Sequence, residues 1–195
     1  MGISTVQQLI VRGSSQNDYN NSGIDTNAKW VDAFNTALQD LVSDINLTGS
    51  LSISFVAGTR EYDLPDNFFE LQELRDSFKC RVGKRRTYDP YFGCPQGYWI
   101  MNRGSNYAID LYEYSSDETF TGIYTRYPAA LAVADIATQK PDIPTIGENA
   151  LIYYAISKAL RANNQLGQAQ ALEASYEMER RKIRDAAARA MMGGS

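Results

Sequence analysis

The stretch TNAKWVDAFNTALQDLVSDINLTGSLSISF, residues 26–55, decides the fold class because the spacing of its apolar residues changes partway along it. In its first two thirds, apolar residues recur at intervals of one, three and four, which is the period of one face of a helix. Beyond that point Leu51, Ile53 and Phe55 alternate with serines, as on one face of a strand. The stretch therefore predicts a long helix over about residues 27–45, followed by the first strand of a sheet.

The residues ahead of this stretch predict a short helix and then a loop. Val6, Leu9 and Ile10 have helical spacing. Residues 13–23, GSSQNDYNNSG, are polar and rich in turn formers, so we expect a mobile loop there.

The middle third predicts a small antiparallel β region over residues 50–127. Pro65 ends the second strand because proline lacks the N–H that a central strand donates. Phe68, Phe69, Leu71 and Leu74 are expected to be apolar anchors that fill the core beneath this proline turn. Asp110 is expected on the solvent side of its strand, opposite its apolar neighbours. Strands after the first are predicted at residues 59–64, 98–102, 107–112 and 119–127.

Helical spacing returns near the C-terminus. Pro141 and Pro144 predict a stiff, extended linker. Residues 148–162 then predict one helix, residues 168–190 predict a longer, strongly charged one, and residues 191–195, MMGGS, predict a flexible tail.

These elements predict a single α+β domain of 195 residues. We expect a mainly helical bundle, made from the N-terminal long helix and a C-terminal helix pair within residues 145–190. A small antiparallel β meander would be inserted in this bundle.

The composition argues against an enzyme. The chain contains no histidine, which excludes Ser-His-Asp and Cys-His catalysis and His-ligated metals. It also has no GxxxxGK[ST], GxGxxG or HExxH motif. We therefore expect no catalytic residue, cofactor or metal, although a carboxylate-dependent hydrolase stays open as a third class of function.

The net charge of −4 argues against a general affinity for DNA. No run approaches the roughly 20 apolar residues needed to span a bilayer, and the first residues do not look like a leader, so we expect a soluble protein made in the cytoplasm. Cys80 and Cys94 are expected to be reduced thiols; the alternative is a disulfide that pins the loop between them.

A basic, aromatic insert spans residues 79–97. Such a mixture can bind nucleic acid through phosphate contacts and base stacking. The interpretation we favour is a solvated loop or a hairpin between subunits, because the chain as a whole is acidic. The residues proposed for contacts with a neighbouring subunit or with DNA are Lys84, Arg85, Arg86, Tyr88 and Tyr91.

The last predicted helix carries charges that can pair along its surface, such as Glu177 with Arg181. One interpretation is a solvent-exposed helix, in which such pairs contribute little. The other is docking on a partner, because a polar helix with a thin apolar stripe, Leu172 to Ala187, has little reason to be long in a monomer. The candidate contacts are Arg180, Arg181, Lys182, Arg184, Arg189, Met191 and Met192.

The order of elements resembles that of the head-to-tail adaptor family of tailed bacteriophages. After the early helices come EYDLPDNFFELQEL (residues 61–74), YAIDLYEY (107–114), TGIYTRYPAAL (121–131), a proline-containing linker and two C-terminal helices. The succession looks most like the adaptor, or tail-tubular, subunits of short-tailed phages. The insert at residues 79–97 is longer and more basic than the family pattern, so its role does not carry over.

This resemblance implies a structural virion protein at the head–tail junction. Its copies would form a ring, commonly of twelve, beneath the portal and around the DNA channel. The implied partners are the portal protein, a tail or nozzle protein, neighbouring copies and the DNA that passes through without sequence-specific binding. In this family C-terminal segments commonly engage the portal.

Overall fold

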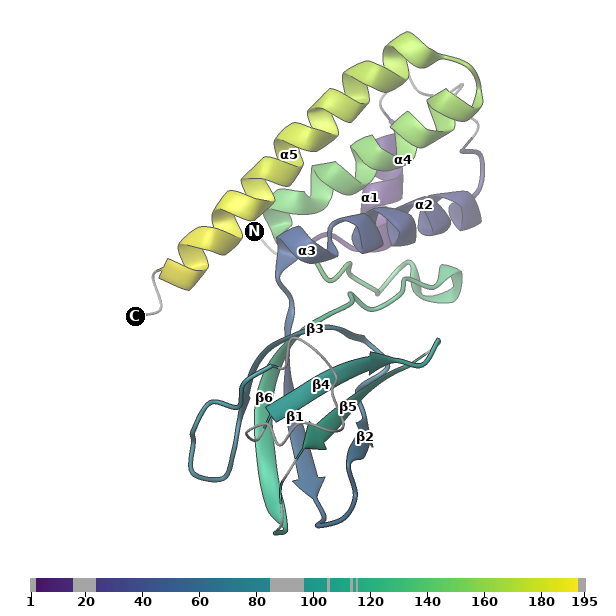
Figure 1. Cartoon of the computed structure of the whole chain (residues 1–195). Coiled ribbons are helices and arrows are strands. Elements are labelled where there is room, and N and C mark those ends of the chain that lie inside the picture. The colour runs from purple at the N-terminus through teal and green to yellow at the C-terminus, as the bar shows by residue number, and fades with distance from the viewer. Residues whose placement is uncertain are drawn as a thin grey trace. The chain divides into compact units, whose positions relative to one another are not determined.

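The computed structural model describes residues 3–15, 24–84, 97–104, 106–112, 114 and 116–192. The chain divides into two compact units, whose elements are labelled in Figure 1. The helical unit consists of Met1–Asn46 and Pro128–Ser195, and the β unit of Leu47–Tyr127. The β unit is therefore an insertion, because the chain leaves the helical unit once and returns to it once.

The described part of the helical unit contains five α-helices. The last two helices run antiparallel as a hairpin, and the second helix packs against the fourth (Figure 1). The helices are α1 (Val6–Ser14), α2 (Asn27–Asp40), α3 (Val42–Ile45), α4 (Glu148–Ala162) and α5 (Leu166–Met192).

The long helix predicted over residues 27–45 is confirmed with one break, at Leu41, which separates α2 from α3. The hydroxyl of Thr26 caps the helix by accepting from the N–H of Lys29 at 3.3 Å. Asn46 has a left-handed φ of 51°, which ends the helix and turns the chain toward the first strand. The predicted apolar stripe is buried: Trp30, Val31, Phe34, Leu38, Leu41, Val42 and Ile45.

Helix α1 is fixed at both ends. Thr5 and Gln8 form a capping box. The N–H of Gln8 donates to the Thr5 hydroxyl at 3.3 Å, and the N–H of Thr5 donates to Oε1 of Gln8 at 2.8 Å. At the other end, a Cβ on Gly13 would lie 2.7 Å from the ring of Trp30, so glycine allows α1 to approach α2 closely. The helix continues to Ser14, and the rest of the predicted mobile loop, residues 16–23, lies outside the described residues.

Glu148, the first residue of α4, connects the N-terminal segment to the C-terminal helices. Its side chain is 5% exposed and accepts from the N–H of Ser4 at 2.7 Å, the Ser4 hydroxyl at 2.9 Å and Nη2 of Arg12 at 2.8 Å. Burial by itself raises the pKa of this carboxyl. The bonds from Ser4 and Arg12 outweigh burial, so the pKa of Glu148 lies below its ordinary value.

The C-terminal helix hairpin matches its prediction closely. α4 has the predicted bounds, and the chain reverses at Asn164, whose φ is 59°. α5 extends to Met192, two residues into the predicted tail, and residues 193–195 lie outside the described part. Ahead of α4, the linker is held by Asn35, whose side-chain amide exchanges two hydrogen bonds, of 3.0 and 2.7 Å, with the backbone of Leu131.

The described part of the β unit contains six strands in two three-stranded antiparallel sheets. One sheet has the order β1–β6–β3 and the other β2–β5–β4. The pairing of β1 with β6 is continuous, from Thr48 opposite Thr125 to Phe55 opposite Glu118. The strands are β1 (Thr48–Phe55), β2 (Glu61–Asp63), β3 (Phe68–Arg75), β4 (Gly97–Asn102), β5 (Tyr107–Tyr112) and β6 (Glu118–Arg126).

The predicted fold class, a mainly helical bundle with one small meander, is wrong. The structure is 44% helical and 25% strand, and its strands form two sheets. A meander pairs each strand with the next one along the chain, whereas among the described strands this holds only for β4 and β5. Alternation of side chains defines the two faces of a strand but not its partner, so the sequence pattern could not reveal this arrangement.

β3 was not predicted as a strand. Phe68 and Leu74 are buried, as expected of apolar anchors, but they lie in a strand that pairs with β6. Its register shifts between Phe68 and Glu70 and again between Leu71 and Glu73. Each shift interrupts the alternation of faces, so the sequence FFELQEL does not show the period of two that marks a regular strand.

The expectation that Asp110 faces solvent is also wrong. Asp110 is 3% exposed. Its carboxylate accepts hydrogen bonds from Nη2 of Arg60 at 2.9 Å and from Nε of Arg60 at 3.2 Å. The guanidinium covers this face of β5 and supplies the hydrogen bonds that a buried carboxylate requires.

The core of the β unit is formed by side chains from both sheets. Phe55 contacts Phe120 edge to face at 6.0 Å, and Phe68 stacks on Tyr124 at 5.7 Å between ring centres. The buried residues are Leu51, Ile53, Phe55, Leu64, Phe68, Leu74, Val82, Tyr98, Ile109, Leu111, Phe120 and Tyr124.

Two further sequence expectations concern the cysteines and membrane-spanning helices. Cys80 is exposed, and Cys94 lies outside the described residues, so the redox state of this pair stays a prediction. Over the described ranges, no helix combines the length and the apolar character needed to cross a membrane.

Replacing Glu148 by glutamine tests its role as a connection. The variant keeps an oxygen acceptor but leaves Arg12 without its counterion, so we expect the free energy of unfolding to fall by about 1–2 kcal/mol at pH 7. Because the folded-state pKa is lowered, this contribution is present above the ordinary carboxyl pKa. It is lost as the pH falls through the folded value.

Urea unfolding of both proteins between pH 7 and pH 3 checks this, and the difference between them should shrink as the pH falls through the lowered folded-state pKa of Glu148. Asp185→Asn, an exposed carboxylate of the same unit, is the control and should show little difference at any pH. An equal loss at pH 7 and pH 3 would contradict an ionic role for Glu148.

Candidate docking surface

The long helix α5 is held against the helical unit along one stripe. Ala169, Leu172, Tyr176 and Ile183 are all buried, and α5 packs against α4 and α3. Beyond Ile183, the described side chains of residues 184–189 are exposed or half-buried. The C-terminal end of α5, yellow in Figure 1, therefore extends past the packed part of its own unit.

Two aspartates from α2 and α3 receive the basic residues of α5. Asp44 has a side chain only 6% exposed, and it accepts from Nε of Arg180 and, at 3.0 Å, from Nε of Arg184. Nη1 of Arg180 lies 3.5 Å from Oδ2 of Asp40. These bonds leave the side chain of Arg180 only 22% exposed. The aspartates thus fix α5 by charge as well as by apolar contact.

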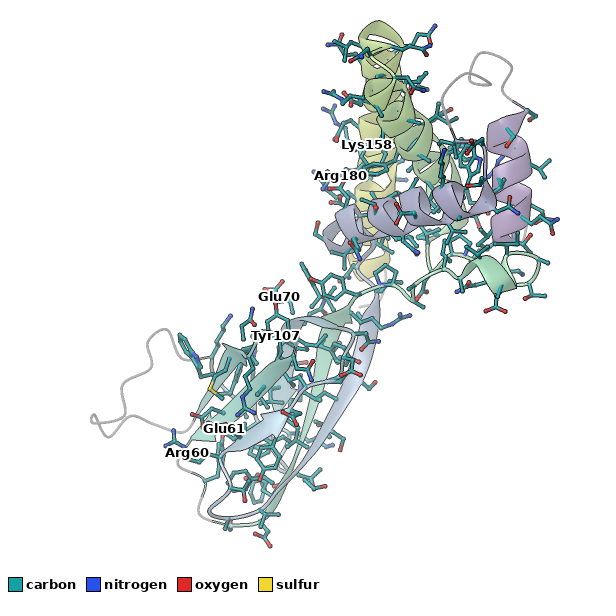
Figure 2. All side chains as sticks on the ribbon, turned by 90° about the vertical axis from the view of Figure 1, so that its right-hand side faces the viewer. Arg60, Glu61, Glu70, Tyr107, Lys158 and Arg180 are labelled. Carbon is teal, nitrogen blue, oxygen red and sulfur yellow. The ribbon has the colours of Figure 1, made fainter. Side chains whose placement is uncertain are left out.

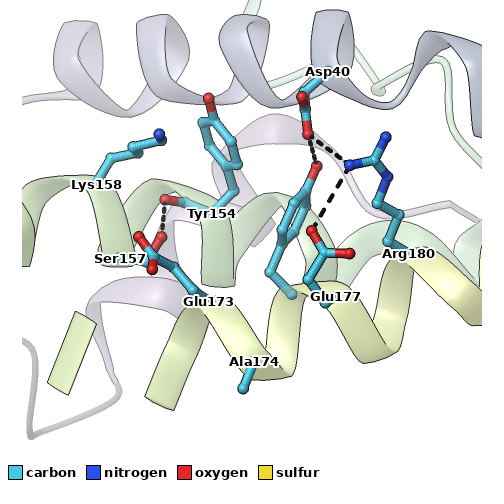
Figure 3. Close-up of a pocket in the computed structure, with 9 residues that line it drawn as sticks. Asp40, Tyr154, Ser157, Lys158, Glu173, Ala174, Glu177 and Arg180 are labelled. Carbon is cyan, nitrogen blue, oxygen red and sulfur yellow. Dashed lines mark hydrogen bonds and ion pairs between the residues drawn. The ribbon is translucent and has the colours of Figure 1, made fainter. Parts of the chain in front are cut away.

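A groove of about 470 Å³ lies beside this cluster, between α2, α4 and α5 (Figure 3). The rings of Tyr154 and Tyr176 meet edge to face at 5.2 Å, and the Tyr176 hydroxyl donates to Asp40 at 2.5 Å. Nζ of Lys158 lies 5.2 Å from the centre of the Tyr154 ring. The groove is lined by Asp40, Tyr154, Ser157, Lys158, Glu173, Ala174, Tyr176, Glu177 and Arg180.

Both tyrosines in the groove are hydrogen-bond donors near neutral pH. Burial raises the pKa of Tyr176, and its bond to the Asp40 carboxylate raises it further. Burial also raises the pKa of Tyr154, with a smaller effect from the charge of Asp40. The groove thus offers neutral hydroxyls, carboxylates, an amine and a guanidinium. This set suits hydrogen bonds and ion pairs with polar side chains of another protein.

The predicted docking residues fall into two groups. Arg180 and Arg184 are engaged inside the chain, as described above. Arg181, Lys182 and Arg189 are exposed on α5, and Lys182 forms an ion pair of 2.7 Å with Glu179.

Two other expectations for α5 are resolved only in part. Glu177 was expected to pair with Arg181. Its Oε1 lies 3.7 Å from Nη1 of Arg180, the residue before Arg181. Met191 and Met192 end α5, and their side chains are outside the described set.

The basic insert lies mostly beyond what the structure describes. Lys84 is exposed and lies at a pocket of the β unit. Arg85, Arg86, Tyr88 and Tyr91 fall outside the described residues, so their proposed contacts stay predictions.

The aspartates that hold α5 were missed by the sequence analysis. Asp40 and Asp44 are four residues apart, so they lie on the same side of the helix, next to the apolar residues Leu41, Val42 and Ile45. An acid within an apolar stripe is a usable signal, because it must be paired once it is buried. Its partners, however, lie 136 and 140 positions later in the chain.

The described residues hold no group of three or more acidic or thiol side chains arranged for a metal ion. Among the same residues, every buried side-chain nitrogen and oxygen has a hydrogen-bond partner.

Comparison with known proteins identifies one family. A family model described as SU10 adaptor protein matches residues 4–195, which is nearly the whole chain. No curated protein matches the sequence. The resemblance inferred from the order of elements is thereby confirmed.

Replacing Asp44 by alanine tests whether it anchors α5. Arg180 and Arg184 lose their shared acceptor, so we expect the free energy of unfolding to fall by about 2 kcal/mol. The amides of α5 should also exchange with deuterium faster than in the wild type, and more so than those of α1. Urea unfolding and hydrogen exchange measure the two effects.

The matched control is Asp185→Ala, which removes an exposed carboxylate from α5 itself. It should change the free energy of unfolding by no more than about 0.5 kcal/mol. If Asp44→Ala behaved like this control, the anchoring role would be wrong.

Proposed function

Because this chain belongs to the SU10 adaptor protein family, a family of phage head-to-tail adaptors, we propose that its copies form a ring that joins the portal to the tail. Family membership makes the chain a structural protein of a phage virion, associated with other virion components. The proposal goes further in three respects: the ring lies beneath the portal at the head–tail junction, it contains about twelve copies, and it surrounds the DNA channel.

The observation that carries the portal contact is the end of α5. This segment extends past the last buried residue, Ile183, and exposes Arg181 and Lys182 on one turn and Arg189 two turns later. A helix end with exposed basic residues suits a groove or an acidic surface on a partner. We assign it to the portal, with the tail or nozzle protein as the partner elsewhere on the ring.

The inner half of α5 prepares this contact. Asp44 and the apolar stripe hold the helix in one position before any partner is present. A helix that is already ordered loses less conformational entropy on binding, so more of the contact energy appears as affinity. Arg180 and Arg184 therefore position the helix, whereas Arg181, Lys182 and Arg189 make the contact.

A structural adaptor needs no catalytic residues. The function of a structural adaptor lies in the shape and charge of its surfaces, which agrees with a chain that contains no histidine. With a net charge of −4, the subunit would have little general affinity for DNA, which suits a channel through which DNA passes.

Binding to the portal of the same phage tests the proposal. We expect the purified protein to co-sediment with assembled portal rings. The double variant Arg181→Glu, Arg189→Glu should bind roughly tenfold more weakly, because two favourable charge contacts become repulsive. Lys140→Glu is the control, since it reverses one exposed charge of the helical unit away from α5.

The outcomes separate the possible errors. If the wild type does not co-sediment, the adaptor function is wrong. If the double variant binds like the wild type, only the assignment of α5 is wrong. Salt-dependent binding of the wild type to any DNA duplex would favour the alternative, a nucleic-acid-associated module that acts through the basic insert.

A further inference from the structure

A loop of the β unit, Asp76–Cys80, presents a phenylalanine to solvent. Phe78 is 83% exposed, far more than any other large apolar side chain of the described residues. Exposing a whole aromatic ring to water is unfavourable. A side chain held in this way is typical of an anchor that is buried only when a partner binds.

The loop is held in one shape by several hydrogen bonds. Oδ1 of Asp76 accepts from the N–H of Phe78 at 2.9 Å and from the N–H of Cys80 at 2.8 Å. The N–H of Asp76 donates to the carbonyl of Cys80 at 3.0 Å. From the neighbouring strand, Oε1 of Glu118 accepts from the N–H and hydroxyl of Ser77 at 3.1 and 2.8 Å. Phe78 therefore sits on a preorganised support.

Lys79, in the same loop, has a φ of 67°, which lies in the left-handed region that favours glycine. The surrounding hydrogen bonds keep the residue in this unfavourable conformation. Backbone strain of this kind is concentrated at binding and switch sites. Lys79 is exposed and directly follows Phe78 in the chain, so the loop also carries a positive charge.

The β unit also contains an aromatic pocket of about 250 Å³, between β3 of one sheet and β4 and β5 of the other. A cavity of about 150 Å³ is enough to bind benzene, so a phenyl ring fits in this volume. Glu70 and Tyr107, both labelled in Figure 2, belong to its lining, and the Glu70 side chain is exposed. The apolar lining is Phe68, Phe69, Leu71, Tyr98, Ile100 and Tyr107.

We propose that Phe78 of one copy inserts into this pocket on the neighbouring copy, with Lys79 of the first copy beside Glu70 of the second. Because the ring and the pocket lie at different positions of the same chain, copies can be joined head-to-tail, each placing its Phe78 in the pocket of the next. A head-to-tail contact leads to a closed ring or to a filament and not to a twofold dimer. The inference deepens the proposed function, on which it rests, by naming the contact between adjacent subunits of the ring.

A thiol cross-linking experiment tests this contact and uses the native Cys80, two residues from Phe78. The first protein is Cys94→Ser, which keeps only Cys80. The second is Cys80→Ser, Cys94→Ser, Glu70→Cys, whose only thiol lies at the pocket. The two proteins are mixed with a short bismaleimide, in solution and on portal rings, and the mixed cross-linked dimer is quantified.

We expect the mixed dimer to form at least tenfold faster than with a control in which Val56→Cys replaces Glu70→Cys. Val56 is a suitable control position because it is 54% exposed in the same unit. Adding Phe78→Ser to the first protein should reduce the rate to that of the control. Since Phe78 is exposed, this change should leave the circular dichroism spectrum unaltered.

Each outcome decides the inference. Faster cross-linking that depends on Phe78, in solution or on the portal, supports it. A rate equal to that of the Val56→Cys control in both settings, or a rate unaffected by Phe78→Ser, overturns it. If the protein binds portal rings and the cross-link still fails, the adaptor function stands and the contact is wrong. If the cross-link forms and portal binding fails, the error lies in the proposed function.

Discussion

The pairing of β1 with β6 is the contact on which the rest of the structure depends. It joins Thr48–Phe55 to the far end of the β unit in continuous register. The entropy lost in closing a loop grows only with the logarithm of its length, so a long ladder and the core behind it can offset that loss. The ladder also brings the ends of the insertion together, where the N–H of Arg126 donates to the carbonyl of Leu47 at 2.8 Å. Helices from both halves of the sequence can therefore form one unit.

The same electrostatic arrangement occurs three times within the described residues. Glu148, Asp110 and Asp44 are buried acids, and each is paired with arginine side chains that keep part of their surface in water. A partly hydrated guanidinium limits the loss of solvation, and its several N–H groups satisfy the carboxylate. In each case the two partners are far apart in sequence, so the pair fixes elements that no local interaction would hold. In α5 this arrangement also decides which basic residues remain available to a partner.

The sequence predicted the elements better than their partners. The bounds of α4 and β5 were predicted as the structure has them, although β5 is buried on both faces from Ala108 to Leu111 and not on one face as expected. β3 was missed because two register shifts remove its alternation, and the two sheets were missed because periodicity does not specify pairing. Of the candidate site, the exposed basic residues of α5 could be named from the sequence. The inward direction of Arg180 could not, since it depends on Asp44, 136 positions earlier.

The position of the β unit within the chain has a consequence for how such genes change. Near the two ends of this unit, Thr48 and Thr125 lie opposite each other on one ladder. The spacing between the two connections is therefore the same whether the insertion is long or short, and units joined in this way tolerate replacement. Recombination can exchange the β unit as a cassette, together with whatever surface it carries, while the helices on either side keep their fold.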